Sequence, residues 1–240
     1  MAEDVAAPTG PVLAVFAHPD DAEISAGATM AKWVSAGREV HLLILTNGDR
    51  GSSDPEVNRS ELARTRAAET EAAARVLGLA SARVLGTHDG ELENIPGVRA
   101  DVVRAIRELR PGTVLTCDPT AWIFQNRYYN HHDHRTAGEI ALDAVFPAAG
   151  NPHFFADQLT DDLRPHDVTD VWLGWSNEPT HHEDVTGFLA TKLAALAEHA
   201  SQVGGDGIRF FEEWLPQEAE EAGAKIGATH AESFRVLALD

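Results

Sequence analysis

Cysteine is almost absent from this sequence, which has a single one, Cys117, among 240 residues. One thiol excludes a disulfide bond within the chain and is typical of a reducing compartment, so we expect a cytoplasmic protein. Cys117 ends the apolar run TVLTC, a context that favours a buried core thiol over a nucleophile. The stretch MAEDVAAPTG at the start has no basic segment followed by an apolar one, and no apolar run approaches the length of a bilayer span. We therefore expect neither a secretory signal nor membrane insertion.

Basic residues are also scarce, with 19 Lys and Arg against 38 Asp and Glu and a formal net charge of −19. This balance argues against general affinity for nucleic acid or anionic lipid, although a local basic pocket is compatible with it. The sequence lacks the Walker A, H-E-x-x-H and G-x-S-x-G motifs, and no G-x-G-x-x-G follows a predicted strand. It does have 12 histidines, several of them in clusters, and a hydrophobic content of 43% that is ordinary for a folded domain.

Apolar, β-branched runs alternate along the chain with segments of helical periodicity. The runs predict strands at Val12–Ala17, Glu39–Thr46, Ala82–Gly86, Gly112–Cys117, Asp170–Gly174 and Phe234–Leu239. The periodic segments predict helices at Ala22–Ser35, 61–78, 97–109, Thr136–Phe146, Gly187–Gln202 and Phe211–Ala222. A long irregular connection is expected at Pro147–His166. The alternation predicts one α/β domain over residues 1–240, with a mostly parallel sheet covered by helices on both faces.

Polar loops follow four of these strands, at the edge of the sheet where ligands bind in such folds. The loop after the first strand reads A-H-P-D-D-A-E at 17–23. Asp20 and Glu23 have capping-box spacing, so the start of a helix explains part of this cluster. Capping does not explain His18, which precedes Asp21 by three residues across a proline-fixed turn. The loop therefore predicts either a capped helix or a cation held by His18 and Asp21.

The second cluster reads N-H-H-D-H-R at 130–135, after the fourth strand. Here too a helix start, with Asp133 as its cap, is the alternative explanation. Three histidines in four positions favour metal binding or acid–base chemistry, because imidazole is the commonest metal ligand and titrates near neutrality. His134 can complete a His-Asp-His set with His18 and Asp21, which leaves open the position that a catalytic zinc reserves for water.

Hydrolysis at such a metal requires a base for the bound water and a group that receives the oxyanion. Asp20, next to a predicted ligand, is the candidate base, and His131 is the candidate acid and oxyanion partner. We expect Asp133 to orient His131 and to favour its protonated form. His132 is expected to face solvent or to pack locally. Together the two clusters predict metal-dependent hydrolysis of an amide or ester.

The motifs AHPDDAEI at 17–24 and H-x-D-H-R at 131–135 resemble those of the PIG-L/LmbE-type deacetylase family. That family includes deacetylases of the mycothiol and bacillithiol pathways and N-acetylglucosaminylphosphatidylinositol deacetylases. Weaker family-like features extend along most of the chain, among them T-N-G-D-R-G at 46–51, K-L-A-A-L-A-E-H-A-S-Q at 192–202 and A-E-S-F-R at 231–235. One departure is His132, at a position often held by proline in related sequences.

The resemblance implies a Rossmann-like three-layer α/β sandwich and one divalent metal, usually Zn²⁺, with Fe²⁺ as the alternative in cells. The metal ligands that it implies are His18, Asp21 and His134. It also implies Asp20 as the general base and His131, backed by Asp133, as the acid and oxyanion stabiliser. Arg66 and Asp89 match positions that hold sugar hydroxyls in the family, although a helix-surface arginine and a turn aspartate are the ordinary alternative.

The reaction implied by the resemblance is removal of an acyl group, with acetyl expected, from the nitrogen of an amino sugar or its conjugate. Three alternatives stay open: an amidase for a larger amide such as a thiol conjugate or acylated natural product, a metal-dependent phosphoesterase, and a non-catalytic sugar-binding protein. The expected partner is a small N-acylated molecule, and nucleic acid is not expected. Homo-oligomer formation is left open.

Several residues outside the two clusters have more than one interpretation. Aromatic side chains near the second cluster either line a substrate mouth or pack in the core: Trp122, Phe124, Tyr128 and Tyr129. His199 and Gln202 are expected to have a structural or pocket-rim role, rather than one on the metal. His181 and His182 are expected in a surface loop.

Overall fold

A computed structural model describes residues 10–205 and 207–239 of the chain. The nine N-terminal residues, on which the expectation of no secretory signal depends, lie outside this part. Within it, no helix is both long and apolar enough to cross a membrane.

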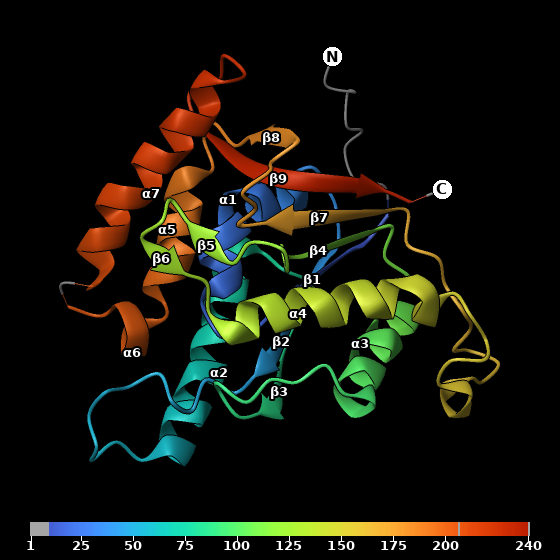
Figure 1. The fold of residues 1–240 in the computed structure, drawn as a ribbon. Coiled ribbons are helices and arrows are strands. Elements are labelled where there is room, and N and C mark those ends of the chain that lie inside the picture. Colours follow the sequence, from blue (N-terminus) through green and yellow to red (C-terminus); the bar gives the residue numbers. More distant parts are fainter. Residues whose placement is uncertain (1–9, 206, 240) are drawn as a thin grey trace.

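The centre of the fold is a seven-stranded sheet in the order β3-β2-β1-β4-β7-β9-β8 (Figure 1). Its strands are β1 (Val12–Phe16), β2 (Val40–Thr46), β3 (Ser81–Thr87), β4 (Thr113–Cys117), β7 (Asp170–Gly174), β8 (His181–Asp184) and β9 (Ala231–Ala238). Strands β1, β2, β3, β4 and β7 are parallel, whereas β9 runs antiparallel to both of its neighbours, β7 and β8. All six predicted strands are present, and the prediction of a mostly parallel sheet is confirmed.

Strand β1 illustrates why the sequence forms a sheet that is buried on both sides. Val12, Ala14 and Phe16 point into one apolar layer. Leu13 and Val15 alternate with them and point into the opposite layer. All five side chains are buried, so the strand reads as a continuous apolar run instead of an alternation of apolar and polar residues.

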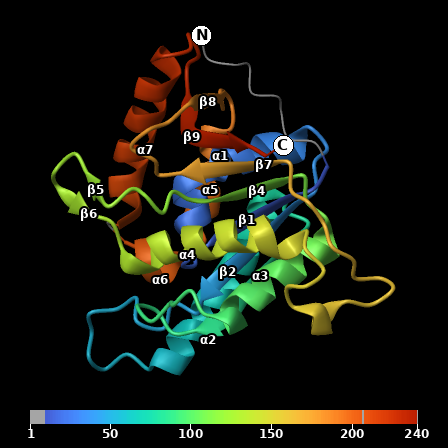
Figure 2. The same cartoon turned by 45° about the vertical axis from the view of Figure 1, so that its right-hand side comes forward.

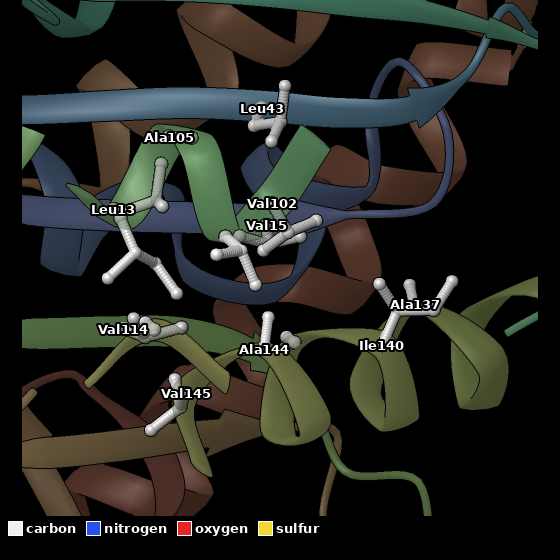
Figure 3. Packing of buried hydrophobic residues seen from close by; sticks show 14 of the residues in the cluster. Leu13, Val15, Leu43, Val102, Ala105, Val114, Ala137, Ile140, Ala144 and Val145 are labelled. Atoms are coloured by element: carbon white, nitrogen blue, oxygen red, sulfur yellow. The ribbon is translucent and has the colours of Figure 1, made fainter. Parts of the chain in front are cut away.

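Helices form the two outer layers of the fold (Figures 1 and 2). They are α1 (Asp21–Ser35), α2 (Arg59–Leu77), α3 (Pro96–Leu109), α4 (His132–Asp143), α5 (Leu189–Ala197), α6 (Ala200–Val203) and α7 (Gly207–Ala224). Helices α3 and α4 pack on one face, where Val102 and Ile140 meet β-strand residues such as Val15 (Figure 3). Helices α1, α2 and α5 cover the other face, and α7 packs beside α5. The predicted three-layer α/β sandwich is therefore confirmed.

Two predicted helices have different boundaries in the structure. The segment Gly187–Gln202 forms α5 and α6 rather than one helix, because His199 leaves helical geometry (φ −80°, ψ 51°) and its side chain is fully buried. Helix α4 begins at His132 instead of Thr136, and its N-cap is His131, so the alternative explanation with Asp133 as the cap does not hold. After Asp143 the chain continues as a π-helical turn, Ala144–Ala149, which includes part of the predicted irregular connection.

Two short pairings were not predicted. His181 and His182 lie on β8, which pairs with β9, so their assignment to a surface loop was wrong. Their sequence H-H-E-D has no apolar alternation because β8 lies at the edge of the sheet, where polar side chains are tolerated. Strands β5 (Ile123–Phe124) and β6 (Tyr128–Tyr129) form a small separate hairpin, and two residues per strand are too few to leave a pattern.

Strands β1 and β4 are parallel neighbours in the sheet, and the connections that follow them leave in opposite directions. After β1 the chain crosses through α1, on one face, to β2. After β4 it passes through the β5–β6 hairpin and α4, on the opposite face, to β7. The carboxyl ends of β1 and β4 therefore form the switch point where open α/β sheets bind ligands.

Candidate active site

The turn between β1 and α1 sends two adjacent carboxylates in different directions. The backbone N–H of His18 donates to Asp21 Oδ2 (2.8 Å), which holds the Asp21 carboxylate beside the His18 ring. Asp20 has left-handed backbone angles (φ 99°, ψ −27°), a conformation that is strained for any residue with a Cβ atom. As a result, Asp20 Oδ2 lies 3.4 Å from Arg66 Nη2 on helix α2.

Helix capping does not account for the acidic residues of this turn. Asp20 occupies the N-cap position of α1, but its side chain makes no capping hydrogen bond. Glu23, which has the spacing of a capping box, is fully buried, and its Oε2 lies 3.4 Å from His199 Nε2. The capping interpretation of these two residues was therefore wrong, since their side chains form contacts with distant parts of the chain.

Asp21 joins the two sequence clusters at 17–23 and 130–135. Its Oδ2 lies 3.2 Å from His18 Nδ1, and its Oδ1 lies 3.2 Å from His134 Nε2, so the three predicted metal ligands are in mutual contact through this carboxylate. Ligand atoms of His18, His131 and His134 also come within 4.8 Å of one another, as do those of His18, Asp89 and Asp133. The site therefore contains groups of imidazoles and carboxylates that can hold a metal ion.

Asn130 fixes the protonation of one of these imidazoles. Its Oδ1 lies 3.0 Å from His134 Nδ1, and its Nδ2 donates to the backbone oxygen of Ala121 (2.8 Å), which sets the orientation of the amide. Because an amide oxygen only accepts, His134 Nδ1 carries a proton, and Nε2 is the nitrogen on the side of Asp21 that can bind a metal. Sequence reasoning did not single out Asn130, although a polar residue four positions before His134 was a usable signal.

Asp133 contacts a different histidine from the one predicted. Its carboxylate lies 3.2 Å from His18 Nε2 and accepts from the backbone N–H groups of Gly90 (2.7 Å) and Leu92 (3.3 Å). Only its backbone N–H reaches His131, at Nδ1 (3.1 Å). The carboxylate of Asp133 thus orients His18, and the predicted side-chain contact with His131 was wrong.

His131 is half-buried beside two other imidazoles. Burial, together with the neighbouring His18 and His134, lowers the pKa of His131, although Asp133 acts in the opposite direction. The expected stabilisation of its protonated form is therefore outweighed. Because Nδ1 accepts the Asp133 N–H, the neutral ring carries its proton on Nε2 and can still donate a hydrogen bond.

Arg66 is buried, with 3% of its surface exposed, and organises the carboxylates around it. Its guanidinium donates to the backbone oxygens of Pro19 (2.6 Å) and Gly48 (3.0 Å). It also lies 3.4 Å from Asp20 and 3.7 Å from Asp89. Burial raises the pKa of Asp20 to about 6, against the opposing effect of Arg66. The helix-surface interpretation of Arg66 was therefore wrong.

The predicted residues surround one cavity of about 340 Å³. Its lining consists of His18, Asp20, Asp21, Arg50, Gly51, Arg66, Asp89, Tyr128, His131, His134 and Gln202. Asp133 lies behind this surface, fully buried. The pocket-rim prediction for Gln202 is confirmed, whereas Arg50 was not singled out by sequence reasoning. Arg50 donates to the backbone oxygen of Asp89 (2.8 Å) and pairs with Glu91, so it anchors the Asp89 loop at the rim.

The remaining candidates separate into surface and core positions. The aromatics in and next to the hairpin do not pack in the core: Trp122 is 52% exposed, Tyr128 53% and Tyr129 62%, and Phe124 is half-buried. His132 is exposed and packs locally through its Nε2 contact with the backbone oxygen of Leu92 (3.0 Å), as expected. Cys117 and His199 are fully buried, which confirms the core thiol.

These observations define the class of the protein: an α/β sandwich with a polar cavity at the switch point, containing imidazoles and carboxylates that can hold a metal ion. The model of the PIG-L family, described as GlcNAc-PI de-N-acetylase, matches residues 13–145. The chain belongs to the PIG-L family.

Relatives and solved structures agree with this assignment. The chain is 36% identical to diacetylchitobiose deacetylase of Thermococcus kodakarensis over 94% of its length and 82% of that protein. It is 34% identical to 1D-myo-inositol 2-acetamido-2-deoxy-alpha-D-glucopyranoside deacetylase of Thermomonospora curvata, covering 80% of both. The structure of N,N'-diacetylchitobiose deacetylase from Pyrococcus horikoshii superposes with a TM-score of 0.87 at 32% identity, covering 95% of this chain and 84% of that one.

Proposed function

We propose that this protein is a metal-dependent N-deacetylase that hydrolyses the N-acetyl amide of an amino sugar or amino-sugar conjugate. The observation that carries the proposal is the position of Asp20, a carboxylate with a raised pKa, beside the imidazole–carboxylate group in one open cavity. The names of the relatives support the substrate class, because these proteins are deacetylases of N-acetylated sugars. We propose one domain over residues 1–240 and a cytoplasmic location, which the single buried Cys117 supports.

We propose His18, Asp21 and His134 as ligands of one divalent cation, with Zn²⁺ as the leading candidate. Two imidazoles and one carboxylate are the donor set of many catalytic zinc sites, and the contact with Asn130 prepares Nε2 of His134 as a neutral ligand. When bound, such a cation acts as a Lewis acid toward water and the acyl carbonyl.

Asp20 is the proposed general base that accepts a proton from the attacking water. A pKa of about 6 suits this role near neutral pH, because the carboxylate is then ionised and is still basic enough to be protonated transiently during the reaction. Arg66 positions this carboxylate through its Nη2, which lies 3.4 Å from Asp20 Oδ2. In the same proposal, the proton is then available to the departing amine, since Asp20 faces the cavity in which the amide lies.

His131 is the proposed oxyanion partner. Its neutral ring presents an Nε2–H donor, so it can stabilise a negatively charged oxygen without first taking up a proton. Arg66 and Asp89 are the proposed contacts for sugar hydroxyls, with one donor group and one acceptor group on the same wall of the cavity. Asp133 acts on the site indirectly, by holding His18.

Metal analysis combined with acetate release from N-acetylated amino sugars tests the proposal. Asp20→Asn is expected to keep its metal and to lose about 10²- to 10⁴-fold in kcat, because it removes a base but no ligand. Asp161→Asn is the matched control, since that side chain is fully exposed and is not among the residues that line the cavity. Full activity of metal-loaded Asp20→Asn would contradict the role of Asp20, and full metal content in His18→Ala would contradict the ligand set.

The same panel, extended with N-acyl sugars of longer chain length and with a phosphorylated N-acetylated sugar, separates this function from the alternatives. A preference for long acyl chains or larger amides favours the broader amidase. Release of phosphate without acetate indicates a phosphoesterase, and binding of the sugars without turnover indicates a non-catalytic protein.

A further inference from the structure

Three polar side chains of the segment 199–202, H-A-S-Q, contact three different parts of the molecule: helix α1, helix α2 and the cavity. His199 is fully buried and pairs with Glu23 of helix α1. Ser201 binds helix α2, because Glu69 accepts from both its backbone N–H (2.7 Å) and its Oγ (2.6 Å). Gln202 lines the cavity. The two neighbouring contacts fix this short segment against α1 and α2, so Gln202 is held in place at the cavity wall.

The hydrogen bonds of Ser201 determine which way the Gln202 amide faces. A carboxylate only accepts, so the Ser201 hydroxyl donates its one hydrogen bond to Glu69. Its oxygen can then only accept from Gln202, whose Nε2 lies 3.2 Å away. The amide nitrogen of Gln202 is therefore directed at Ser201, and Oε1 is the atom left for another partner.

Gly51 leaves the space that this oxygen occupies. A Cβ atom at position 51 would lie 2.7 Å from Gln202 Oε1 and 2.5 Å from Arg66 Nη1, so the ends of these two side chains come together over the glycine. No residue in the described part of the chain donates a hydrogen bond to Oε1. The cavity wall thus offers a fixed neutral acceptor next to the guanidinium donor of Arg66.

We infer that Gln202 is a specificity-determining residue whose Oε1 accepts a hydrogen bond from one hydroxyl group of the sugar substrate. The inference rests on the proposed function, which supplies a sugar to the cavity. A neutral, oriented acceptor suits a hydroxyl, which has both a proton to donate and lone pairs to receive a bond from Arg66. A site built to bind a hydroxyl discriminates against an analogue that lacks it, because the oriented amide oxygen, half-buried at the cavity wall, then loses its partner.

The test compares Gln202→Met with wild type on N-acetylglucosaminides that lack one hydroxyl each, at O3, O4 or O6. Methionine keeps the length of the side chain but removes the acceptor. We expect wild type to lose about tenfold in kcat/KM on one of the three analogues, and Gln202→Met to lose about tenfold on the parent sugar. On that one analogue the variant should lose nothing further. Glu198→Gln, at the exposed position directly before this segment, is the control for general disturbance.

Metal content and thermal unfolding of both variants are measured in parallel, so a folding defect is recognised. The inference is overturned if Gln202→Met and Glu198→Gln have the same kcat/KM on the parent sugar. It is also overturned if wild type and Gln202→Met lose the same factor in kcat/KM on each of the three analogues. Failure of the proposed function looks different, because wild type then releases no acetate from any of the sugars. In that case calorimetric affinities for the same sugars decide, and equal affinities of wild type and Gln202→Met overturn the role of Gln202.

Discussion

Removal of the Glu232 carboxylate is expected to destabilise helix α1, which begins at the proposed metal ligand Asp21. Helix α1 is interrupted at Ala26, where the backbone leaves helical geometry (φ −145°, ψ 20°). Glu232 on β9 accepts from the backbone N–H groups of Ala28 (3.3 Å) and Thr29 (2.7 Å) just after this kink. The same carboxylate pairs with Lys192 of α5 at 2.6 Å, so it joins three elements of the fold.

The size of the effect follows from burial. Glu232 is 6% exposed and Lys192 is 4% exposed, so Glu232→Ala leaves an ammonium group and two N–H groups without their acceptor in the interior. Breaking a buried pair from one side costs about 3–5 kcal/mol of unfolding free energy. Glu108→Ala, which removes an exposed pair with Arg104 (3.8 Å), is the matched control and should cost about 0.5 kcal/mol or less.

Urea unfolding followed by circular dichroism measures both variants, with midpoints compared at equal m-values. Lys192→Met in the Glu232→Ala background removes the unpaired charge and is expected to restore part of the lost stability, which a double-mutant cycle quantifies. A midpoint of Glu232→Ala within error of Glu108→Ala would refute the reasoning, because it would mean that the pair is solvated rather than buried.

Three further results are expected. Gly138→Ala should lower the free energy of unfolding in urea by more than about 2 kcal/mol, because the new Cβ would lie 2.3 Å from the last carbonyl oxygen of β4. The control, Gly97→Ala, places its Cβ where no atom lies within 4 Å, so it should be neutral or stabilising. Asn130→Ala should weaken metal binding about 10- to 100-fold in chelator competition, and an unchanged affinity would contradict its role in fixing the imidazole. Burial lowers the pKa of His199, but the carboxylates of Glu23, Asp20 and Glu69 together outweigh burial and raise it above its ordinary value. Its protonated ring therefore stabilises the fold at low pH, and this contribution is lost as the pH rises above about 6.5, so His199→Gln should flatten the pH dependence of the urea midpoint in that range.

The parts of the site that depend on local spacing could be predicted from the sequence. His18, Asp20 and Asp21 are separated by a turn whose geometry the neighbouring proline restricts, so their proximity follows from the chain itself. Their convergence with His134 required only the rule that the carboxyl ends of neighbouring parallel strands lie at one edge. The same local reasoning predicted all of the longer strands and helices, apart from shifted ends and the break at His199.

Contacts that join distant segments could not be predicted in this way. Asp133 and His131 are two positions apart, yet the Asp133 carboxylate turns to His18 because backbone N–H groups of the 90–92 loop receive it there. Glu23 has the spacing of a capping residue, but a buried histidine from the 199–202 segment offers it a partner in the core. In both cases a tertiary partner outweighed a local preference, and no pattern within a short window contains that information.

The left-handed backbone at Asp20 has a consequence for how this protein responds to selection. Glycine adopts φ 99° without strain, so Asp20→Gly is expected to relieve about 1 kcal/mol of backbone strain while removing the proposed base. Selection for stability and selection for turnover therefore favour different residues at position 20. A library randomised at position 20 and sorted for heat resistance alone should enrich glycine, and the same library sorted for acetate release should return aspartate.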